Sequence, residues 1–208
     1  MKATPPLLVA VCILAALSAC SNAVLDPKYE RNPEPRQKYV VTATVDGAPG
    51  PFEVATAGAQ YVIGPTQTCM PSAEPISGTF PTPSRAGTSA QVRKLPGDRF
   101  EFDIYLDAMR PKDYFGKGVC TWVVEGVSIR LKARNATNER EFVAFLDQEQ
   151  LLGQQPVVLY ARGSLYGKVP GAYDETEEAI EEQHAASRYG TDAGTLFKIT
   201  LQSQESVQ

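Results

Sequence analysis

Short segments in which apolar and polar residues alternate recur along most of this chain, and they constrain its fold more than any other feature. The clearest are Arg99–Leu106 (RFEFDIYL), Tyr39–Val45 (YVVTATV) and Val127–Ala133 (VSIRLKA). An alternation of period two places every second side chain on one face of a β-strand. Gly126 marks a bulge or bend. Because turn-rich segments separate these stretches, we predict a mainly β fold, an antiparallel sandwich- or barrel-like domain. Further strands are predicted for residues 52–57, 59–63, 119–124, 141–146, 156–162 and 195–201.

One segment near the C-terminus has a helical pattern instead. Residues 174–189 (DETEEAIEEQHAASRY) are rich in helix formers, with Asp174 placed as N-cap and Gly190 just past the end. We predict a single surface α-helix here. It has more carboxylates than capping and the helix dipole require, and we interpret four of them as candidates for binding a basic partner. The alternative is a solvated face that only keeps the protein soluble. The four are Glu177, Glu178, Glu181 and Glu182.

The first 19 residues have the features of a secretory signal peptide. Lys2 precedes an apolar run that is too short to cross about 30 Å of hydrocarbon as a helix. The sequence Leu17-Ser18-Ala19-Cys20 resembles the lipobox of bacterial lipoproteins. The resemblance implies cleavage before Cys20 and a diacylglycerol on its sulfur. Because Ser21 follows instead of aspartate, it also implies an outer-membrane location facing the periplasm. The alternative is an ordinary secretory signal with an unrelated cysteine.

The remaining cysteines predict one disulfide. Of four cysteines, Cys12 leaves with the signal peptide and Cys20 takes the lipid, so Cys69 and Cys120 form an even pair in an oxidising compartment. The pair would anchor the long Pro- and Gly-rich stretch of residues 64–89. We expect residues 20–37, which contain three prolines and little apolar content, to form a flexible tether, and residues 38–208 to form a single β-rich domain.

The sequence contains no positive indication of catalysis. Ser164 lacks the Gly-x-Ser-x-Gly setting of a nucleophile, and His184, the single histidine, falls in the acidic helix. No cofactor or phosphate motif and no metal-ligand spacing is present. The net charge of −4, without a Lys/Arg cluster, does not indicate nucleic-acid binding. We predict a protein that is not an enzyme and uses no cofactor or metal. Glu101 and Asp103, on the outward face of one strand, leave open a hydrolase that acts on envelope polysaccharide or lipid.

Residues 106–122 connect two predicted strands and include Cys120 of the predicted disulfide. Met109, Tyr114, Phe115 and Lys117 combine the apolar, aromatic and basic side chains that are common at protein-binding hot spots. We interpret these four as further partner-binding candidates. The alternative is that Tyr114 and Phe115 fill one end of the sandwich while Trp122 packs against the disulfide.

The block Asp-Tyr-Phe-Gly-Lys-Gly-Val-Cys-x-Trp at residues 113–122 resembles one found in small proteobacterial lipoproteins that act as immunity proteins. The likeness extends over residues 100–133. It implies a non-enzymatic inhibitor of an antibacterial effector delivered into the periplasm, and it assigns no individual residue a role. We therefore expect a membrane-anchored lipoprotein that binds another protein, such as a secreted toxin. A structural or assembly lipoprotein of an envelope complex is the second possibility.

Overall fold

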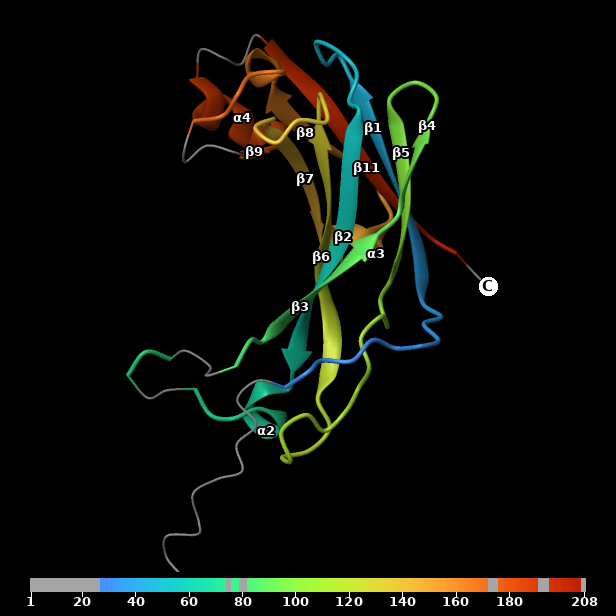
Figure 1. Cartoon of the computed structure of the whole chain (residues 1–208), viewed down its shortest axis with the longest axis vertical. Coiled ribbons are helices and arrows are strands. Elements are labelled where there is room, and N and C mark those ends of the chain that lie inside the picture. The colour runs from blue at the N-terminus through green and yellow to red at the C-terminus, as the bar shows by residue number, and fades with distance from the viewer. Residues whose placement is uncertain (1–26, 74–75, 79–81, 172–175, 191–194, 207–208) are drawn as a thin grey trace, which may run out of the picture.

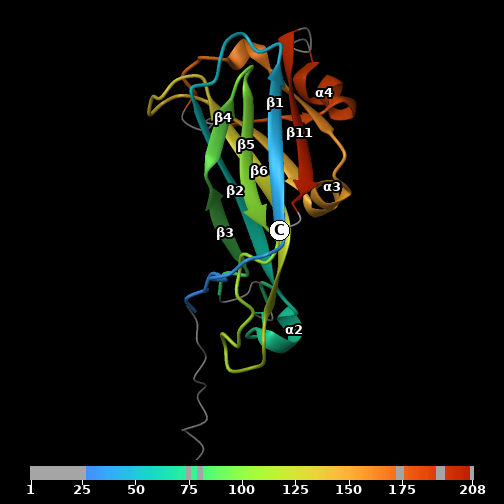
Figure 2. The ribbon, with the colours of Figure 1, turned by 90° about the vertical axis from the view of Figure 1, so that its right-hand side faces the viewer.

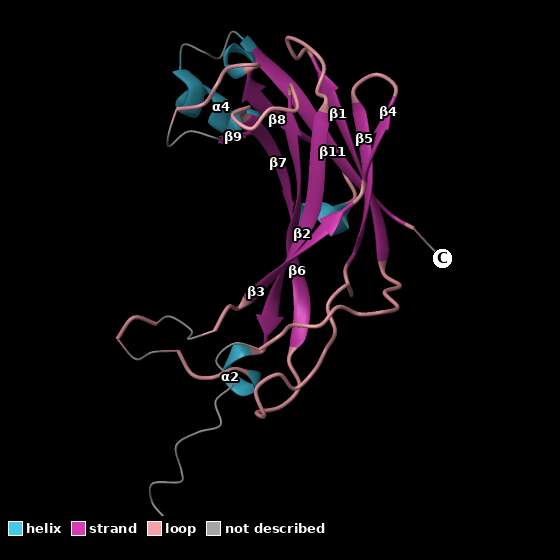
Figure 3. Cartoon of the chain, viewed as in Figure 1, coloured by secondary structure: helices cyan, strands magenta, loops and turns pink. Residues whose placement is uncertain are grey.

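Two β-sheets packed face to face make up most of the molecule (Figures 1 and 3). The structure is a computed structural model and describes residues 27–73, 76–78, 82–171, 176–190 and 195–206. The predicted mainly β, sandwich-like fold is confirmed. The predicted signal peptide and Cys20 lie outside the described residues.

The first sheet has six strands, and its inner face is built from the strongest alternating segments of the sequence. Val41 and Ala43 pair with Phe102 and Phe100 on the neighbouring strand, and all four side chains are buried. Side chains on alternate positions reach the same face because successive Cβ atoms in a strand point to opposite sides. In spatial order the strands are β10 (Ile180–Glu181), β8 (Val157–Arg162), β11 (Leu196–Glu205), β1 (Lys38–Asp46), β5 (Arg99–Tyr105) and β4 (Val92–Leu95).

The second sheet has five strands, of which two are longer than the sequence predicted. One long strand contains most of residues 52–57 and 59–63, which were expected as two strands. A second long strand contains most of residues 119–124 and 127–133, which were also expected as two. Gly126 is the site of the predicted bulge, because the pairing register shifts between Gln60 and Tyr61 opposite it. The strands are, in order, β3 (Arg85–Ala90), β2 (Val54–Gly64), β6 (Thr121–Lys132), β7 (Glu141–Asp147) and β9 (Thr176–Glu178). Among the strands that the structure describes, only β7 and β9 pair in parallel.

The chain crosses from one sheet to the other along both sides of the sandwich. On one side β3 pairs with β2, and after Gln91 the chain continues as β4, which pairs with β5. On the other side β9 pairs with β7, and after the buried Ala179 the chain continues as β10, which pairs with β8. The sandwich therefore has partly barrel-like edges, which limits the unpaired edge that either sheet offers to another chain.

Aromatic side chains fill the core at the end of the sandwich where β2 begins. The rings of Phe52, Phe142 and Phe197 contact one another, with centroids 5.3–5.9 Å apart. All three are buried. Such pairs add to the transfer free energy of burying three large apolar side chains.

Two helices lie between strands of the C-terminal half. The six-residue α3 (Gln148–Gly153), which was not predicted, begins at a capping box: Asp147 accepts the backbone N–H of Gln150, whose side chain accepts the N–H of Asp147. The second, α4 (Glu182–Tyr189), is the predicted surface helix.

The predicted helix boundaries were wrong at the N-terminal side. Residues 176–178 and 180–181 form β9 and β10 instead of helix, and the helix begins only at Glu182. The segment is a strand despite its high helix propensity because it lies at the edge of both sheets. There, backbone pairing and the burial of Ala179 outweigh the local preference for helix. Asp174, the expected N-cap, lies outside the described residues.

A second, smaller core lies at one end of the sandwich, around the disulfide. Cys69 ends the short α2 (Thr66–Cys69), and its Cα lies 5.2 Å from that of Cys120, within the range expected of a disulfide. The predicted pairing is confirmed in the structure. The buried residues of this disulfide-end core are Ile63, Cys69, Met70, Tyr114, Phe115 and Cys120, with Tyr29 and Trp122 packed against them.

The expected tether is shorter than the sequence suggested. Within residues 27–37, Tyr29 packs edge-to-face on Trp122 and Tyr114, with centroids 4.7 and 5.2 Å away. Asn32 bonds to the backbone of Ala108 and Asp107. The Asp107 carboxylate also accepts the backbone N–H groups of Arg36 and Gln37. These contacts attach the segment to the domain, because the packed aromatic ring and the hydrogen bonds outweigh a proline-rich composition.

Candidate functional site

The outer face of the five-stranded sheet forms a broad hollow. Figure 1 shows this sheet bowed, with α4 and β9 at one end of the face and α2 at the other. A hollow of about 450 Å³ lies over β3, β2, β6 and β7. We call this surface the concave face. Its lining residues are Thr56, Ala57, Gly58, Ala59, Gln60, Gly87, Thr88, Ser89, Gly126, Ser128, Arg130 and Phe145.

Small residues form the floor of the concave face, and two of them are required by close backbone approach. A Cβ placed on Gly58 would lie 2.1 Å from the carbonyl oxygen of Thr88 on the neighbouring strand. A Cβ on Gly126 would lie 2.2 Å from the ring of Phe145. Glycine at these positions lets β3 approach β2 and lets an aromatic ring lie across β6. At these two positions the floor carries no side chain.

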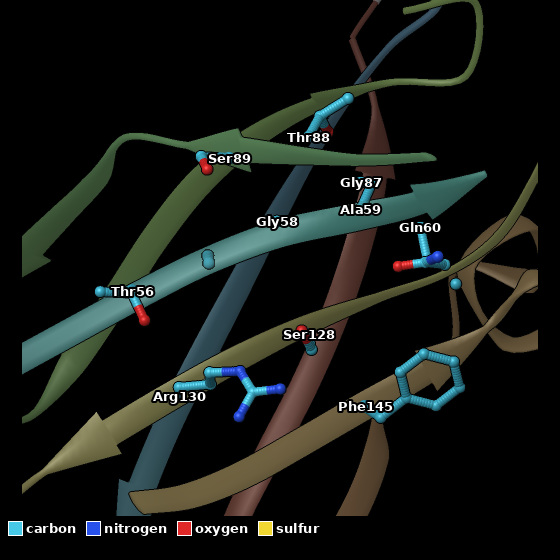
Figure 4. Close-up of a pocket in the computed structure, with 12 residues that line it drawn as sticks. Thr56, Gly58, Ala59, Gln60, Gly87, Thr88, Ser89, Ser128, Arg130 and Phe145 are labelled. Carbon is cyan, nitrogen blue, oxygen red and sulfur yellow. The ribbon is translucent and has the colours of Figure 1, made fainter. Parts of the chain in front are cut away.

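One large apolar side chain remains exposed among the residues that line the concave face. Phe145, which pairs across the strands with Ser128, is 39% exposed. Figure 4 shows the Phe145 ring and the Arg130 side chain on either side of Ser128. An aromatic ring that stays exposed in a hollow offers a large apolar surface for contact with another molecule.

The charged side chains on the concave face already neutralise one another. Arg85 binds Glu125 through two hydrogen bonds of 2.8 and 2.7 Å. Glu141 contacts Arg130 at 3.0 Å and Lys132 at 3.2 Å. The bonds from Arg85 lower the pKa of Glu125. Burial alone would raise the pKa of Glu141, but the bonds from Lys132 and Arg130 outweigh it and lower that pKa. The face therefore presents a nearly neutral surface to a partner.

Three of the four predicted binding residues in the loop before β6 are not available to a partner. Met109, Tyr114 and Phe115 are buried, and the Tyr114 hydroxyl donates to the carbonyl of Arg110 at 2.6 Å. The hot-spot interpretation was wrong for these three. The alternative, that the aromatic residues fill one end of the sandwich with Trp122 against the disulfide, describes the structure. Only Lys117 is exposed.

The four candidate glutamates near the C-terminus do not form one recognition surface. Glu177 is buried and binds the Arg162 guanidinium through hydrogen bonds of 2.8 and 2.7 Å. Glu181 is half-buried and accepts a bond from Gln150. Glu178 and Glu182 are exposed. The helical interpretation failed here because β9 places Glu177 inward, so that only two of the four carboxylates are free to attract a partner.

The described side chains offer little to a catalytic mechanism. His184 is exposed on α4, and Ser164 lies in a 3-10 turn at Gly163–Leu165. Arg93 binds both Glu101 and Asp103, and Lys38 also binds Asp103. Burial raises the pKa of Asp103, but the bonds from Arg93 and Lys38 outweigh it and lower that pKa. A glycosidase acid requires the opposite shift.

Within the ranges that the structure describes, no three His, Cys, Asp or Glu side chains are grouped so that they could hold a metal ion. In the same ranges no helix is both long and apolar enough to span a membrane. Comparisons with protein-family models, with curated proteins and with solved structures gave no match.

Sequence reasoning did not identify the concave face. The signal was nonetheless present, as small or polar residues at every second position: Thr56, Gly58 and Gln60 on β2, with Gly126 and Ser128 on β6. Pairing the two strands brings these residues together on one face. That pairing is a long-range property, which single-strand alternation does not reveal.

Proposed function

We propose that this protein is a lipid-anchored, non-catalytic protein of the bacterial envelope that binds a partner protein on its concave face. The observation on which the proposal depends is the hollow over β3, β2, β6 and β7, with the Phe145 ring exposed beside a floor of small residues. A surface with this composition fits a rounded, largely uncharged segment of another protein. Partly exposed aromatic residues at the centre of such a surface are frequent sites of binding energy.

The envelope location rests on the sequence before the folded domain. The Leu17-Ser18-Ala19-Cys20 motif supports export and lipidation at Cys20, and an outer-membrane destination follows from Ser21. The Cys69–Cys120 bond supports an oxidising compartment, because disulfides are rare where thiols are kept reduced.

Immunity against an antibacterial effector is the most specific form of this function. It is supported by the resemblance of residues 113–122 to a block of periplasmic immunity lipoproteins. The residues of that block that are buried around the disulfide form part of the scaffold, so the block would identify the kind of protein and not its binding surface. A permanent partner in an envelope complex would use the same concave face. One experiment distinguishes such a partner from an antibacterial effector.

Photo-crosslinking in cells tests the proposal. A photoreactive phenylalanine is placed at position 145, and as a matched control at position 158 on the other sheet, where Val158 is 38% exposed and Phe145 is 39% exposed. We expect a protein adduct from position 145 and none from position 158. An adduct that forms only when effector-delivering attacker cells are present supports immunity, and one that forms without them supports an assembly role. Equal adducts at both positions, or none at 145 under either condition, would contradict binding on the concave face.

A further inference from the structure

The described chain begins at the disulfide end of the molecule. Tyr29 lies against Tyr114 and Trp122, both of which pack with the Cys69–Cys120 bond. Seven residue steps separate Cys20 from Pro27, and a fully extended chain covers at most about 3.6 Å per step, so roughly 25 Å in all. A lipid on Cys20 would therefore hold the disulfide end close to the bilayer, whatever path the intervening residues take.

The loop at that end presents two side chains from a firmly held backbone. Lys112 and Cys120 exchange both backbone hydrogen bonds, at 3.1 and 3.0 Å. Between them the Asp113 carboxylate accepts the N–H groups of Phe115, Gly116 and Lys117, at 2.7–3.2 Å. Lys117 is exposed at the tip, and Val119 is 60% exposed beside it. Figure 2 shows this loop and α2 together at the same end of the molecule.

The disulfide end is basic although the whole chain is acidic. Segments 28–31 and 110–120 carry five basic and two acidic side chains, a balance of +3, whereas the chain has a net charge of −4. Both acids are engaged: Glu30 binds Arg110 and Lys112, and Asp113 binds the loop backbone. Neither Lys28 nor Lys117 forms an ion pair with a described residue. At the opposite end, α4 and β9 carry the exposed Glu182 and Glu178 (Figure 1).

We propose that the disulfide end rests on an anionic phospholipid bilayer, with Lys28 and Lys117 against the headgroups and Val119 at the acyl boundary. This deepens the proposed function and depends on the lipid at Cys20. One anchor fixes only a point, whereas basic side chains beside that anchor would hold the same end of the domain against the headgroups. Each basic side chain near an anionic surface contributes about a fivefold preference. The concave face would then stand to the side of the molecule, open to a partner in the periplasm.

Lysine acetylation of the mature, acylated protein in vesicles tests this orientation. Vesicles of phosphatidylcholine alone are compared with vesicles that also contain phosphatidylglycerol, and each lysine is read by mass spectrometry. We expect the acetylation rate of Lys117 to fall about fivefold in the anionic vesicles, and to recover at high salt. Lys168 is the internal control, because it is exposed and follows the turn at Gly163–Leu165, at the opposite end of the sandwich.

Two variants with the same change in charge make the test specific. Lys117→Glu should abolish the additional protection of Lys28 in anionic vesicles, whereas Lys168→Glu should leave it intact. Equal acetylation of Lys117 in both kinds of vesicle, with Cys20 acylated, would overturn membrane docking and leave the anchor and the concave face unaffected. Protection of Lys117 only in cells that contain a partner protein would also overturn it, because a protein would then cover this end. An N-terminal peptide without acyl groups on Cys20 would overturn both the anchor and the docking.

Discussion

At the scale of single residues, Glu177 shows how one position can have opposite roles in a helix and in a strand. As part of an acidic helix it would be a solvated charge, but on β9 it is buried and binds Arg162. A carboxylate in this setting stabilises the fold, because its partner would otherwise lose two charge-assisted hydrogen bonds.

Replacing Glu177 should therefore destabilise the protein. We expect Glu177→Gln to lower the free energy of unfolding by about 1.5–3 kcal/mol, the range for a hydrogen bond to a charged group. Glu178→Gln is the matched control, since Glu178 is exposed on the same strand and should change stability by less than about 0.5 kcal/mol. Urea unfolding measures both. Equal effects of the two substitutions would contradict the buried ion pair.

Gly58 is the second residue whose role is specific to its position. We expect Gly58→Ala to lower the free energy of unfolding by about 1–3 kcal/mol. The new Cβ would lie 2.1 Å from the Thr88 carbonyl oxygen, so the backbone of one of the two strands would have to move. Gly87→Ala, on the neighbouring strand, is the control: the nearest atom is 3.7 Å away, an ordinary contact. Thermal unfolding distinguishes them. A Gly58→Ala protein as stable as Gly87→Ala would show that β2 and β3 are not packed this closely.

At the scale of elements, the disulfide joins two segments that flank the paired strands β2 and β6. Cys69 ends α2, and Cys120 immediately precedes β6, 51 residues later in the chain. The small core around this bond packs Met70, Tyr114 and Phe115, and it is separate from the main core between the sheets. We expect the two regions to respond differently when the bond is removed.

A Cys69→Ser/Cys120→Ser double variant should lower the free energy of unfolding by about 4 kcal/mol, from the entropy of the loop that the bond closes. Amide exchange should rise at Lys112 and at position 120, whose backbone bonds close the loop, and stay slow in β1, β5 and β11. Trp122, the single tryptophan, reports the change by fluorescence. Uniformly faster exchange in all strands would show that the two cores unfold as one unit.

At the scale of the whole molecule, carboxylates whose pKa values are lowered by ion pairs lie on both sheets. Asp103 and Glu141 are the two most covered of these, and in each case bonds from basic partners outweigh the effect of burial. A carboxyl whose pKa is lower in the folded state stabilises the protein above its unfolded value, and this contribution disappears as the pH falls through the folded value.

Stability should therefore decline as the pH falls below about 4.5, the unfolded value for a glutamate. We expect an Asp103→Asn/Glu141→Gln variant to be less stable at neutral pH and to show a shallower decline in acid, because two of the titrating groups are gone. The contribution is modest, since both pairs are partly solvated. Urea midpoints from pH 7 downward measure it. An acid decline of unchanged slope in the variant would contradict a role for these two groups.

The sequence by itself determined the main strands and the disulfide of this protein, but it did not reveal the edge strands β3, β4, β9 and β10. Alternation in Arg99–Tyr105 and Lys38–Asp46 is sufficient, because only a strand puts every second side chain into the core. The pairing of Cys69 with Cys120 followed from the number of cysteines left after the signal and the lipobox. These properties depend on neighbouring residues or on counting, so one chain is enough to reveal them.

The tertiary structure alone decided which residues are free to bind. Tyr114 and Phe115 have the composition of an interface, yet they fill a core, because Tyr29 and the disulfide cover them. Glu177 turns inward because β9 closes a sheet edge. Phe145 remains exposed because bowed strands and two glycines leave an open floor beside it. Each outcome depends on contacts between segments that are far apart in the sequence. The alternation of residues within one segment does not predict such contacts.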